Sequence, residues 1–171
     1  TSFFKTTLER EIQLLTSLSM NLNWVLKKFE ALTPYELYDI MWLRNEVFVV
    51  EQNCVYQDAD YKDQKGWHYM GVDEEGKLMA YVRLLPPGVS YVEPSIGRVL
   101  TNPVARRVGI GRILMQYAIE QCMLLFGDVS IKIGAQYYLL NFYSSLGFVQ
   151  TSEIYLEDDI EHIEMIRKIQ I

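Results

Sequence analysis

Apolar residues recur along this chain with the two periods that distinguish helices from strands. Thr33 and Pro34 supply a helix N-cap and a first-turn proline, so we predict a helix that starts there and keeps an apolar face as far as Phe48. A longer helix is predicted over residues 109–126, where positions 110, 113, 114, 117 and 118 are apolar or aromatic and Gly127 follows as the cap. A third helix is expected over residues 137–146.

Short segments with strand-like patterns separate these helices. They cover residues 23–29, 68–72, 77–85, 96–101, 129–133, 148–156 and 163–169. The turn Asp73-Glu74-Glu75-Gly76 joins the second and third segments and predicts a hairpin. Hairpins together with helical crossovers produce a mixed sheet flanked by helices, so the predicted fold class is α+β.

Two segments fall outside this alternation. Leucine and isoleucine residues between positions 8 and 18 have helical spacing, so residues 1–19 are expected to form a helical extension without catalytic duty. We expect residues 20–171 to form a single domain. Residues 52–65 are polar and have no regular period, which predicts a long loop or a short helix. Loops of that length within a compact domain are often functional.

Composition narrows the class of protein. A chain of 171 residues fits one domain, and 50% of its residues are hydrophobic, enough for a globular core. The net charge of -6, from 16 basic and 22 acidic residues, argues against a nucleic-acid partner. No apolar run approaches the roughly 18 to 20 residues that span a bilayer, and no secretion signal is evident. We therefore expect a cytoplasmic protein without a membrane partner.

Basic residues are nevertheless concentrated in one place. Arg98, Arg106, Arg107 and Arg112 fall within fifteen residues, and no acidic residue occurs between positions 94 and 119. The run from Arg106 to Gly111 follows a predicted strand and opens the long helix, where glycines and free N–H groups favour phosphate oxygens. The pattern does not match a phosphate-loop NTPase, because no Gly-Lys-Ser/Thr follows the glycines. It also lacks the Gly-x-Gly-x-x-Gly fingerprint of the Rossmann fold.

The order of these motifs resembles a known family. A strand, Arg-x-x-Gly-x-Gly, a long helix, a strand, Gln136 and the run from Phe142 to Phe148 are similar to the GNAT superfamily of acetyl-CoA-dependent N-acetyltransferases. Five further blocks resemble its ElaA-like branch: residues 43–52, 56–60, 83–87, 96–99 and 162–165. The resemblance covers residues 20–168 and implies a GNAT-like, partly splayed mixed sheet that uses acetyl-CoA as co-substrate.

The resemblance also implies how the donor is held. In the family, N–H groups of the glycine loop bind the pyrophosphate, and the preceding strand pairs with the pantetheine arm. A slot between splayed strands takes the thioester, whose oxyanion meets a main-chain N–H, here expected to be that of Leu100. The predicted cofactor-binding residues are Val99, Leu100, Thr101, Arg106, Arg107, Val108, Gly109, Ile110, Gly111, Arg112, Gln136 and Tyr143.

Direct transfer to an amine needs a base and an acid. An alkyl amine has a pKa of about 10 and arrives protonated. Relatives often carry a glutamate base on the strand where this chain has Arg98, so the base is sought near the long loop. The alternatives are Glu46, Glu51, Asp58, Asp60 and His68, of which Glu51 is preferred. By family resemblance, Tyr143 is expected to protonate the leaving thiolate.

Several alternatives stay open at this point. Cys54 or Cys122 as an acyl carrier is disfavoured because neither shows an activating neighbour, and no metal is predicted. Acidic residues of the loop and near position 158 are expected mainly to solubilise the surface, although they could attract a cationic amine. The acceptor is a small-molecule or protein amine, and a homodimer is left open. The competing function is a CoA-binding sensor or interaction module with weak or no catalysis.

Overall fold

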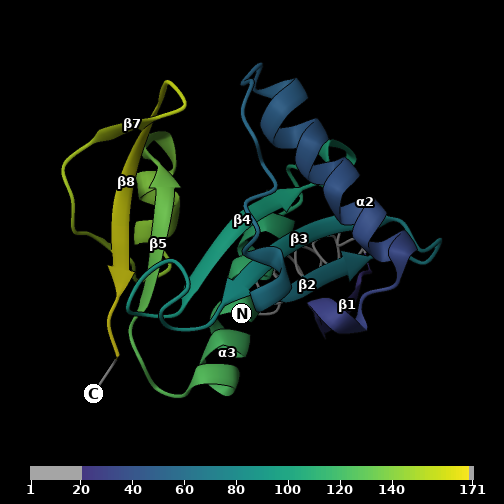
Figure 1. Cartoon of the computed structure of the whole chain (residues 1–171), viewed down its shortest axis with the longest axis horizontal. Coiled ribbons are helices and arrows are strands. Elements are labelled where there is room, and N and C mark those ends of the chain that lie inside the picture. Colours follow the sequence, from purple (N-terminus) through teal and green to yellow (C-terminus); the bar gives the residue numbers. More distant parts are fainter. Residues whose placement is uncertain (1–20, 170–171) are drawn as a thin grey trace, which may run out of the picture.

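The computed structural model describes residues 21–169, so the expected extension over residues 1–19 lies outside the described residues. One mixed sheet has the strand order β1-β2-β3-β4-β5-β8-β6, and β7 pairs with β8 (Figure 1). Its strands are β1 (Asn23–Lys28), β2 (Trp67–Val72), β3 (Leu78–Leu85), β4 (Ser95–Thr101), β5 (Ile131–Gln136), β6 (Val149–Gln150), β7 (Tyr155–Glu157) and β8 (Ile160–Arg167). The predicted α+β class and GNAT-like sheet are confirmed.

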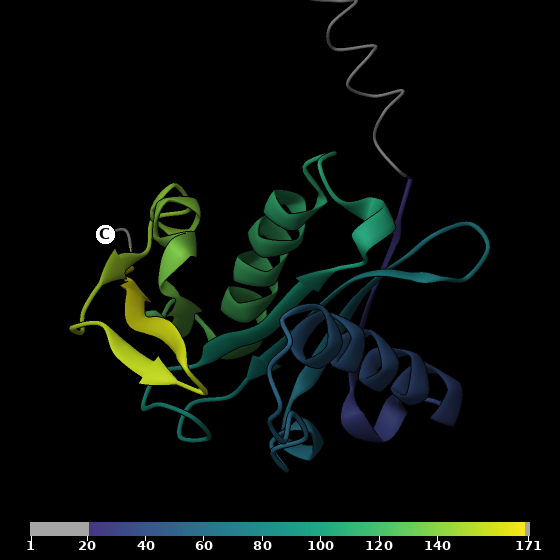
Figure 2. The same ribbon diagram turned by 90° about the horizontal axis from the view of Figure 1, so that it is seen from above.

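Helices cover both faces of the sheet. Figure 2 shows α2 on one face, with α3 and α4 on the other. Their bounds are α2 (Pro34–Arg44), the π-helix η2 (Asn45–Glu51), α3 (Ile110–Phe126) and α4 (Leu140–Ser144). Single turns of 3-10 helix occur at η1 (Phe29–Ala31), η3 (Asp63–Lys65), η4 (Pro103–Ala105) and η5 (Tyr137–Leu139). Within residues 21–169, no helix has the length and apolar character needed to cross a membrane.

The predicted starts of the two main helices are confirmed. Thr33 and Glu36 form a capping box, in which the Thr33 hydroxyl accepts from the Glu36 N–H and the Glu36 carboxylate accepts from the Thr33 N–H. Gly109, with φ 82°, precedes α3, and Gly127, with φ 85°, ends it. Both glycines adopt a left-handed conformation that residues with a side chain rarely take.

Four predicted boundaries are wrong. The strand expected at residues 163–169 is β8, which runs from Ile160 to Arg167. The strand expected at residues 129–133 is β5, which starts only at Ile131 because Val129 donates to Gly127 O in a tight turn. The helix expected over residues 137–146 is a 3-10 turn followed by the five residues of α4. The strand expected at residues 148–156 is split into β6 and β7, because the Ser152 hydroxyl accepts from the Glu164 N–H and interrupts the backbone ladder.

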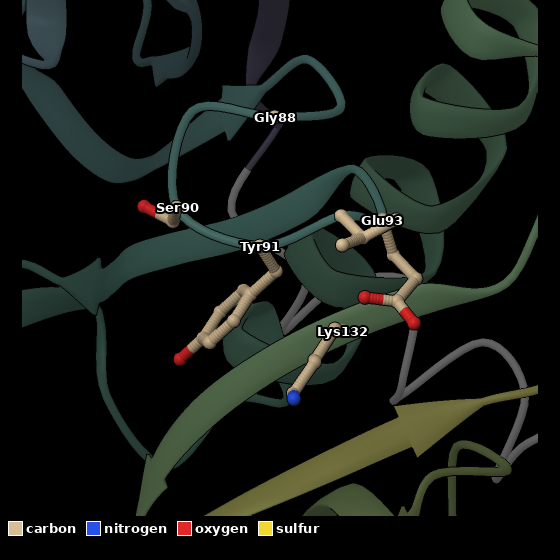
Figure 3. Close-up of a pocket in the computed structure, with 6 residues that line it drawn as sticks. Gly88, Ser90, Tyr91, Glu93 and Lys132 are labelled. Atoms are coloured by element: carbon tan, nitrogen blue, oxygen red, sulfur yellow. The ribbon is translucent and has the colours of Figure 1, made fainter.

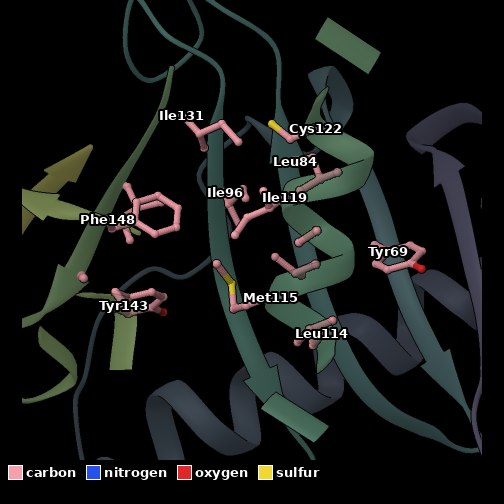
Figure 4. Close-up of a cluster of buried hydrophobic side chains, with 14 of the residues drawn as sticks. Tyr69, Leu84, Ile96, Leu114, Met115, Ile119, Cys122, Ile131, Tyr143 and Phe148 are labelled. Carbon is pink, nitrogen blue, oxygen red and sulfur yellow. The ribbon is translucent and has the colours of Figure 1, made fainter. Parts of the chain in front are cut away.

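Two apolar clusters hold the sheet between its helices. The larger one packs α3 residues such as Leu114 and Met115 against β3, β4 and β5, and extends to Tyr143 and Phe148 (Figure 4). The smaller one places Ile40 and other α2 and η2 residues against the opposite face of β2 and β3. All eight residues of β3 are buried because both faces of this strand are covered.

Candidate active site

β4 and β5 separate after a single point of contact. Their only recorded pairing within the described residues joins Ser95 to Lys132, and beyond it the strands diverge (Figure 1). On its other edge, β4 carries a bulge, because Tyr81 faces Leu100 while Arg83 faces Gly97. Such bulges bend a strand and increase its twist. The splay expected between these strands is therefore confirmed, and the bulge supplies a physical reason for it.

The bulge contains a strained residue. Arg98 has φ 53°, a left-handed conformation that is uncommon for a residue with a long side chain. Its guanidinium lies across the cleft, with Nε 2.8 Å from Asp58 Oδ1 and Nη2 donating to Asp58 O. Strain of this kind persists only where surrounding contacts hold it. Arg98 thus belongs to the wall of the cleft.

The diverging strands enclose a cleft of about 700 Å³. β4 contributes one wall from Ser95 to Thr101, and β5 contributes the other from Ile133 to Gln136. The end of η2, the loop after it and the turn between β7 and β8 complete the lining. The cleft is large enough for the end of an acylated cofactor arm together with an acceptor group.

The glycine loop opens α3 at one end of this cleft. Arg107 and Gly109 have φ 68° and 82°, so the backbone alternates in a way that turns successive N–H groups to one side. In the described part of the chain, the N–H groups of residues 107–111 have no hydrogen-bond acceptor. An ideal Cβ on Gly109 would meet no atom within 4 Å, so conformation alone requires a glycine there. These free donors at a helix N-terminus fit an anion such as a diphosphate.

The arginines of the loop have different partners. Arg106 donates from both terminal nitrogens to Glu51, at 2.8 and 2.9 Å. Arg112 donates to Ser145 Oγ and lies over the Phe142 ring. Arg107 is exposed and has no recorded ion pair within residues 21–169. Arg107 is therefore the loop arginine most available to a phosphate.

Two polar bridges join the last residue of η2 and the residue after it to the far sides of the cleft. One is the Glu51–Arg106 ion pair, and the other runs from Gln136 Nε2 to Gln52 Oε1 at 3.0 Å. Gln136 ends β5, so these bridges cross the open end of the splay. A pantetheine amide that reached Gln136 would have to replace a weak neutral contact, which costs little.

Tyr143 projects from α4 into the cleft lining. Its ring packs edge-on against Phe142, at a centroid distance of 5.1 Å. It also packs edge-on against Phe148, at 6.1 Å (Figure 4). Burial raises the pKa of the Tyr143 phenol well above its usual value. The phenol therefore carries its proton at neutral pH, and the same burial makes it a weaker acid than a tyrosine in water.

The structure separates the five groups considered as the base. Glu51 and Asp60 line the cleft, whereas Glu46, Asp58 and His68 do not. His68 is fully buried on β2, with Nδ1 2.8 Å from Tyr81 Oη and Nε2 3.1 Å from Asp63 O. Asp60 is held by two hydrogen bonds from Arg83, at 2.7 and 2.8 Å. Burial opposes ionisation of Asp60, yet Arg83 outweighs it and lowers the pKa of this carboxyl.

The acidic residues of the long loop are not surface groups, contrary to our expectation. Asp58 and Asp63 are 7% and 6% exposed and both pair with Arg44, which is fully buried on α2. Asp63 also pairs with Arg83 of β3 at 2.9 Å. Buried charges of this kind must be paired. The network therefore fixes the irregular loop against the sheet and positions it as a cleft wall.

His162 also lines the cleft, and sequence reasoning missed it as a functional residue. It lies on β8, opposite Gln136 of β5 and Tyr155 of β7. Its only signal in the sequence was membership of the block at residues 162–165, which carries no chemistry by itself. Among the described residues, no three histidine, cysteine or acidic side chains are grouped so that they could hold a metal ion.

A second, shallower hollow of about 520 Å³ flanks the loop between β3 and β4 (Figure 3). Tyr91 and Lys132 line it, with the Lys132 ammonium 4.8 Å from the centre of the Tyr91 ring. Tyr91 reaches over Gly134 of β5, where an ideal Cβ would lie 3.0 Å from its hydroxyl. The loop tip thus rests on bare backbone at the closed end of the main cleft.

Comparison with known proteins agrees with this geometry. The family described as the acetyltransferase (GNAT) domain matches residues 35–169. The chain belongs to the GNAT family. GNAT domains transfer an acyl group from a CoA thioester, which is the chemistry that the splayed strands and the glycine loop suggest.

Two proteins of similar sequence align with this chain over almost their whole length. Protein ElaA of Escherichia coli is 38% identical over 150 residues, which cover 86% of this chain and 97% of ElaA. The UPF0039 protein sll0451 of Synechocystis is also 38% identical, over 88% of this chain and 97% of its own length. The ElaA-like resemblance is confirmed.

Solved structures give the same result. An acyl-CoA N-acyltransferase from Pseudomonas aeruginosa superposes with a TM-score of 0.82 at 42% identity, over 86% of this chain and 99% of the other. The crystal structure of E. coli ElaA gives 0.81 at 37% identity, over 86% and 100% of the two chains. This GNAT chain therefore shares an acyl-CoA-dependent N-acyltransferase fold.

Proposed function

We propose that this GNAT protein transfers an acetyl group from acetyl-CoA to a primary amine of a small molecule or protein, by direct attack of the amine on the thioester. The observation that carries this proposal is the continuity of the donor side. The unpaired edge of β4 leads directly from the splay to the free N–H groups of residues 107–111. A chain with an amide-bearing arm and a terminal diphosphate fits such a surface along its whole length.

Each donor-side residue then has a specific duty. The loop N–H groups of Val108 to Gly111 bind the pyrophosphate, and Arg107 and Arg112 add positive charge. The β4 edge at Val99, Leu100 and Thr101 pairs with the pantetheine arm, which Gln136 meets from β5. The Leu100 N–H stabilises the oxyanion that develops when the amine attacks.

Tyr143 completes the transfer in this proposal. Attack forms a carbon–nitrogen bond and breaks the carbon–sulfur bond, so the departing thiolate needs a proton. The buried, protonated phenol of Tyr143 lines the cleft and supplies it. Glu51 as the base stays a prediction. Because both of its oxygens are bound to Arg106, it could accept a proton only after that ion pair opens.

The test is release of free thiol from acetyl-CoA against polyamines, amino acids, aminoglycosides and lysine peptides. We expect turnover with at least one amine, and a fall in kcat of about 100-fold in Tyr143→Phe. CoA should stabilise both proteins equally against heat, because the phenol hydroxyl is not required for binding the diphosphate.

A different outcome would identify the competing function. CoA binding without turnover for any amine, and without an effect of Tyr143→Phe, would favour the sensor or interaction module. No thermal shift at millimolar CoA would contradict both functions, since each requires the donor cleft.

A further inference from the structure

Proton removal requires a cleft group with a free lone pair, and the acidic side chains expected for this duty are occupied. Glu51 is bound through both oxygens to Arg106, and Asp60 through both oxygens to Arg83. Asp58 accepts from Arg44 and lies beside Arg98. An acceptor ammonium would therefore have to compete with a guanidinium for the oxygens of each of these carboxylates.

His162 differs from these groups in how its ring is held. Nδ1 lies 2.9 Å from the carbonyl oxygen of Ile160, within the same strand. A carbonyl oxygen only accepts hydrogen bonds, so Nδ1 must carry the proton. In a neutral ring Nε2 then bears the lone pair. No described residue donates to or accepts from Nε2, although the ring is half-buried in the cleft lining.

The neighbouring strands fix the direction of this ring. Ile163 and Met165 on β8 are buried in the larger core cluster, so the alternate position 162 faces the other side of the sheet. There His162 lies between its cross-strand neighbours Gln136 and Tyr155, and it stacks on the Tyr155 ring at a centroid distance of 6.0 Å. Gln136 and Tyr143 line the same cleft.

We propose that His162 is the general base of the transfer, and that its Nε2 accepts a proton from the acceptor ammonium directly or through one water. This inference rests on the proposed function. The imidazole takes one proton from the ammonium, and the neutral amine attacks the thioester carbon. Tyr143 gives its proton to the departing sulfur, and the nitrogen releases its second proton to restore the phenol. The net products are the amide, the free thiol and one proton in solvent.

Ionisable groups on the same face of the sheet as His162 come from three strands. Tyr155 and Glu157 are on β7, Glu164 is on β8, and Lys132 is farther along β5, opposite Ile166. Lys132 and Glu164 pair at 2.8 Å, which neutralises the charges on that side. Two acidic residues of the β7–β8 turn region, Glu157 and Asp158, line the cleft and would favour approach of a cationic amine.

A pair of substitutions separates catalysis from structure. His162→Asn keeps an N–H donor near the position of Nδ1, so it can retain the bond to Ile160 O, but it has no basic nitrogen. His162→Gln instead places a neutral amide near the position of Nε2. With spermidine, lysine, kanamycin and a lysine peptide as acceptors, both variants should lose about 100-fold in kcat/KM for each amine used by the wild type. The activity that remains should rise with pH as more amine becomes neutral.

The rival base is tested by Glu51→Gln, in which the loss of kcat should be smaller than in either His162 variant. A large loss of kcat in Glu51→Gln with near-normal His162→Asn would overturn the assignment in favour of Glu51. Wild-type activity in His162→Asn would also overturn the assignment, because that variant preserves only the structural hydrogen bond.

A measurement without turnover gives an independent answer. The chain has only 2 histidines, and the structure gives them opposite tautomers, because Nε2 of His68 bonds a carbonyl whereas Nδ1 of His162 does. Nitrogen NMR of the CoA-bound protein should show one protonated Nε2 and one protonated Nδ1, the latter lost in His162→Asn. A protonated Nε2 on neutral His162 would contradict the base role.

Failure of the broader function has a different signature. A wild-type protein that is stabilised by CoA yet releases no thiol with any of the four amines would overturn both the transfer function and the base assignment. Turnover by the wild type with no loss in either His162 variant would overturn the base assignment alone.

Discussion

The two ends of the cleft are built from different materials. The donor end is mainly backbone, with free N–H groups at residues 107–111 and an unpaired edge of β4. The acceptor wall is mainly side chains, whose charges are already neutralised by Arg44, Arg83 and Arg98. The backbone donors are free to bind a ligand, whereas the paired side chains fix the shape of the wall. We therefore expect the glycine-loop end to supply affinity for the donor and the side-chain wall to supply the geometry of the site.

The largest expected effect tests the shape-holding role of the wall. Arg44→Met leaves Asp58 and Asp63 buried without their principal cation, so the free energy of unfolding should fall by about 3–5 kcal/mol. Urea denaturation followed by circular dichroism would measure this. Lys27→Met is the control, because its pair with Glu36 is 30% exposed on each side and should contribute less than about 1 kcal/mol. Equal losses in the two variants would refute a structural role for the network.

The second-largest effect is the loss of folding stability at low pH that the buried carboxylates of the wall cause. Burial opposes ionisation of Asp60 and Asp63, but their arginine partners prevail and lower the pKa of both carboxyls. The unfolded chain therefore binds more protons than the folded one as the pH falls below about 4, and stability is lost there. Between pH 5 and pH 2, the free energy of unfolding of the wild type should fall by roughly 2 kcal/mol more than that of Arg83→Met. If the free energy of unfolding fell equally with pH in the two proteins, the loss would not come from the carboxylates that pair with Arg83.

The smallest effect concerns the donor end. Gly109→Ala keeps open space but forces a side chain into φ 82°, which costs about 1–2 kcal/mol and distorts the N–H array. CoA affinity, measured by calorimetry, should fall about tenfold. Gly76→Ala is a matched control, with φ 83° and equally open space in the turn between β2 and β3. Gly76→Ala should lose a similar amount of stability and keep its CoA affinity. If its CoA affinity fell as much as that of Gly109→Ala, the loop at residues 106–111 would have no special role in binding.

Sequence reasoning succeeded where contacts are local. The capping box at Thr33 and the Arg106–Gly111 loop each lie within a few consecutive residues, so their geometry follows from residue type and spacing. The fold class followed from the alternation of strands and helices, together with the resemblance to the GNAT family.

It failed where partners are distant. Arg44 meets Asp58 and Asp63 across 14 and 19 positions, and Arg98 reaches Asp58 across 40, so a polar loop looked like a solvated surface. Placement of His162 beside the cleft depends on the pairing of β8 with β5, which brings residues 136 and 162 together. Side-chain pairing across a sheet follows from register, which local patterns do not determine.

Gly134 has a consequence for the lining of the cleft. A Cβ on residue 134 would lie 3.0 Å from the Tyr91 hydroxyl and 3.5 Å from the Tyr155 hydroxyl. Even an alanine there would push at least the first of these phenols aside. The place that Tyr91 takes in the cleft lining thus depends on an atom that the protein leaves out.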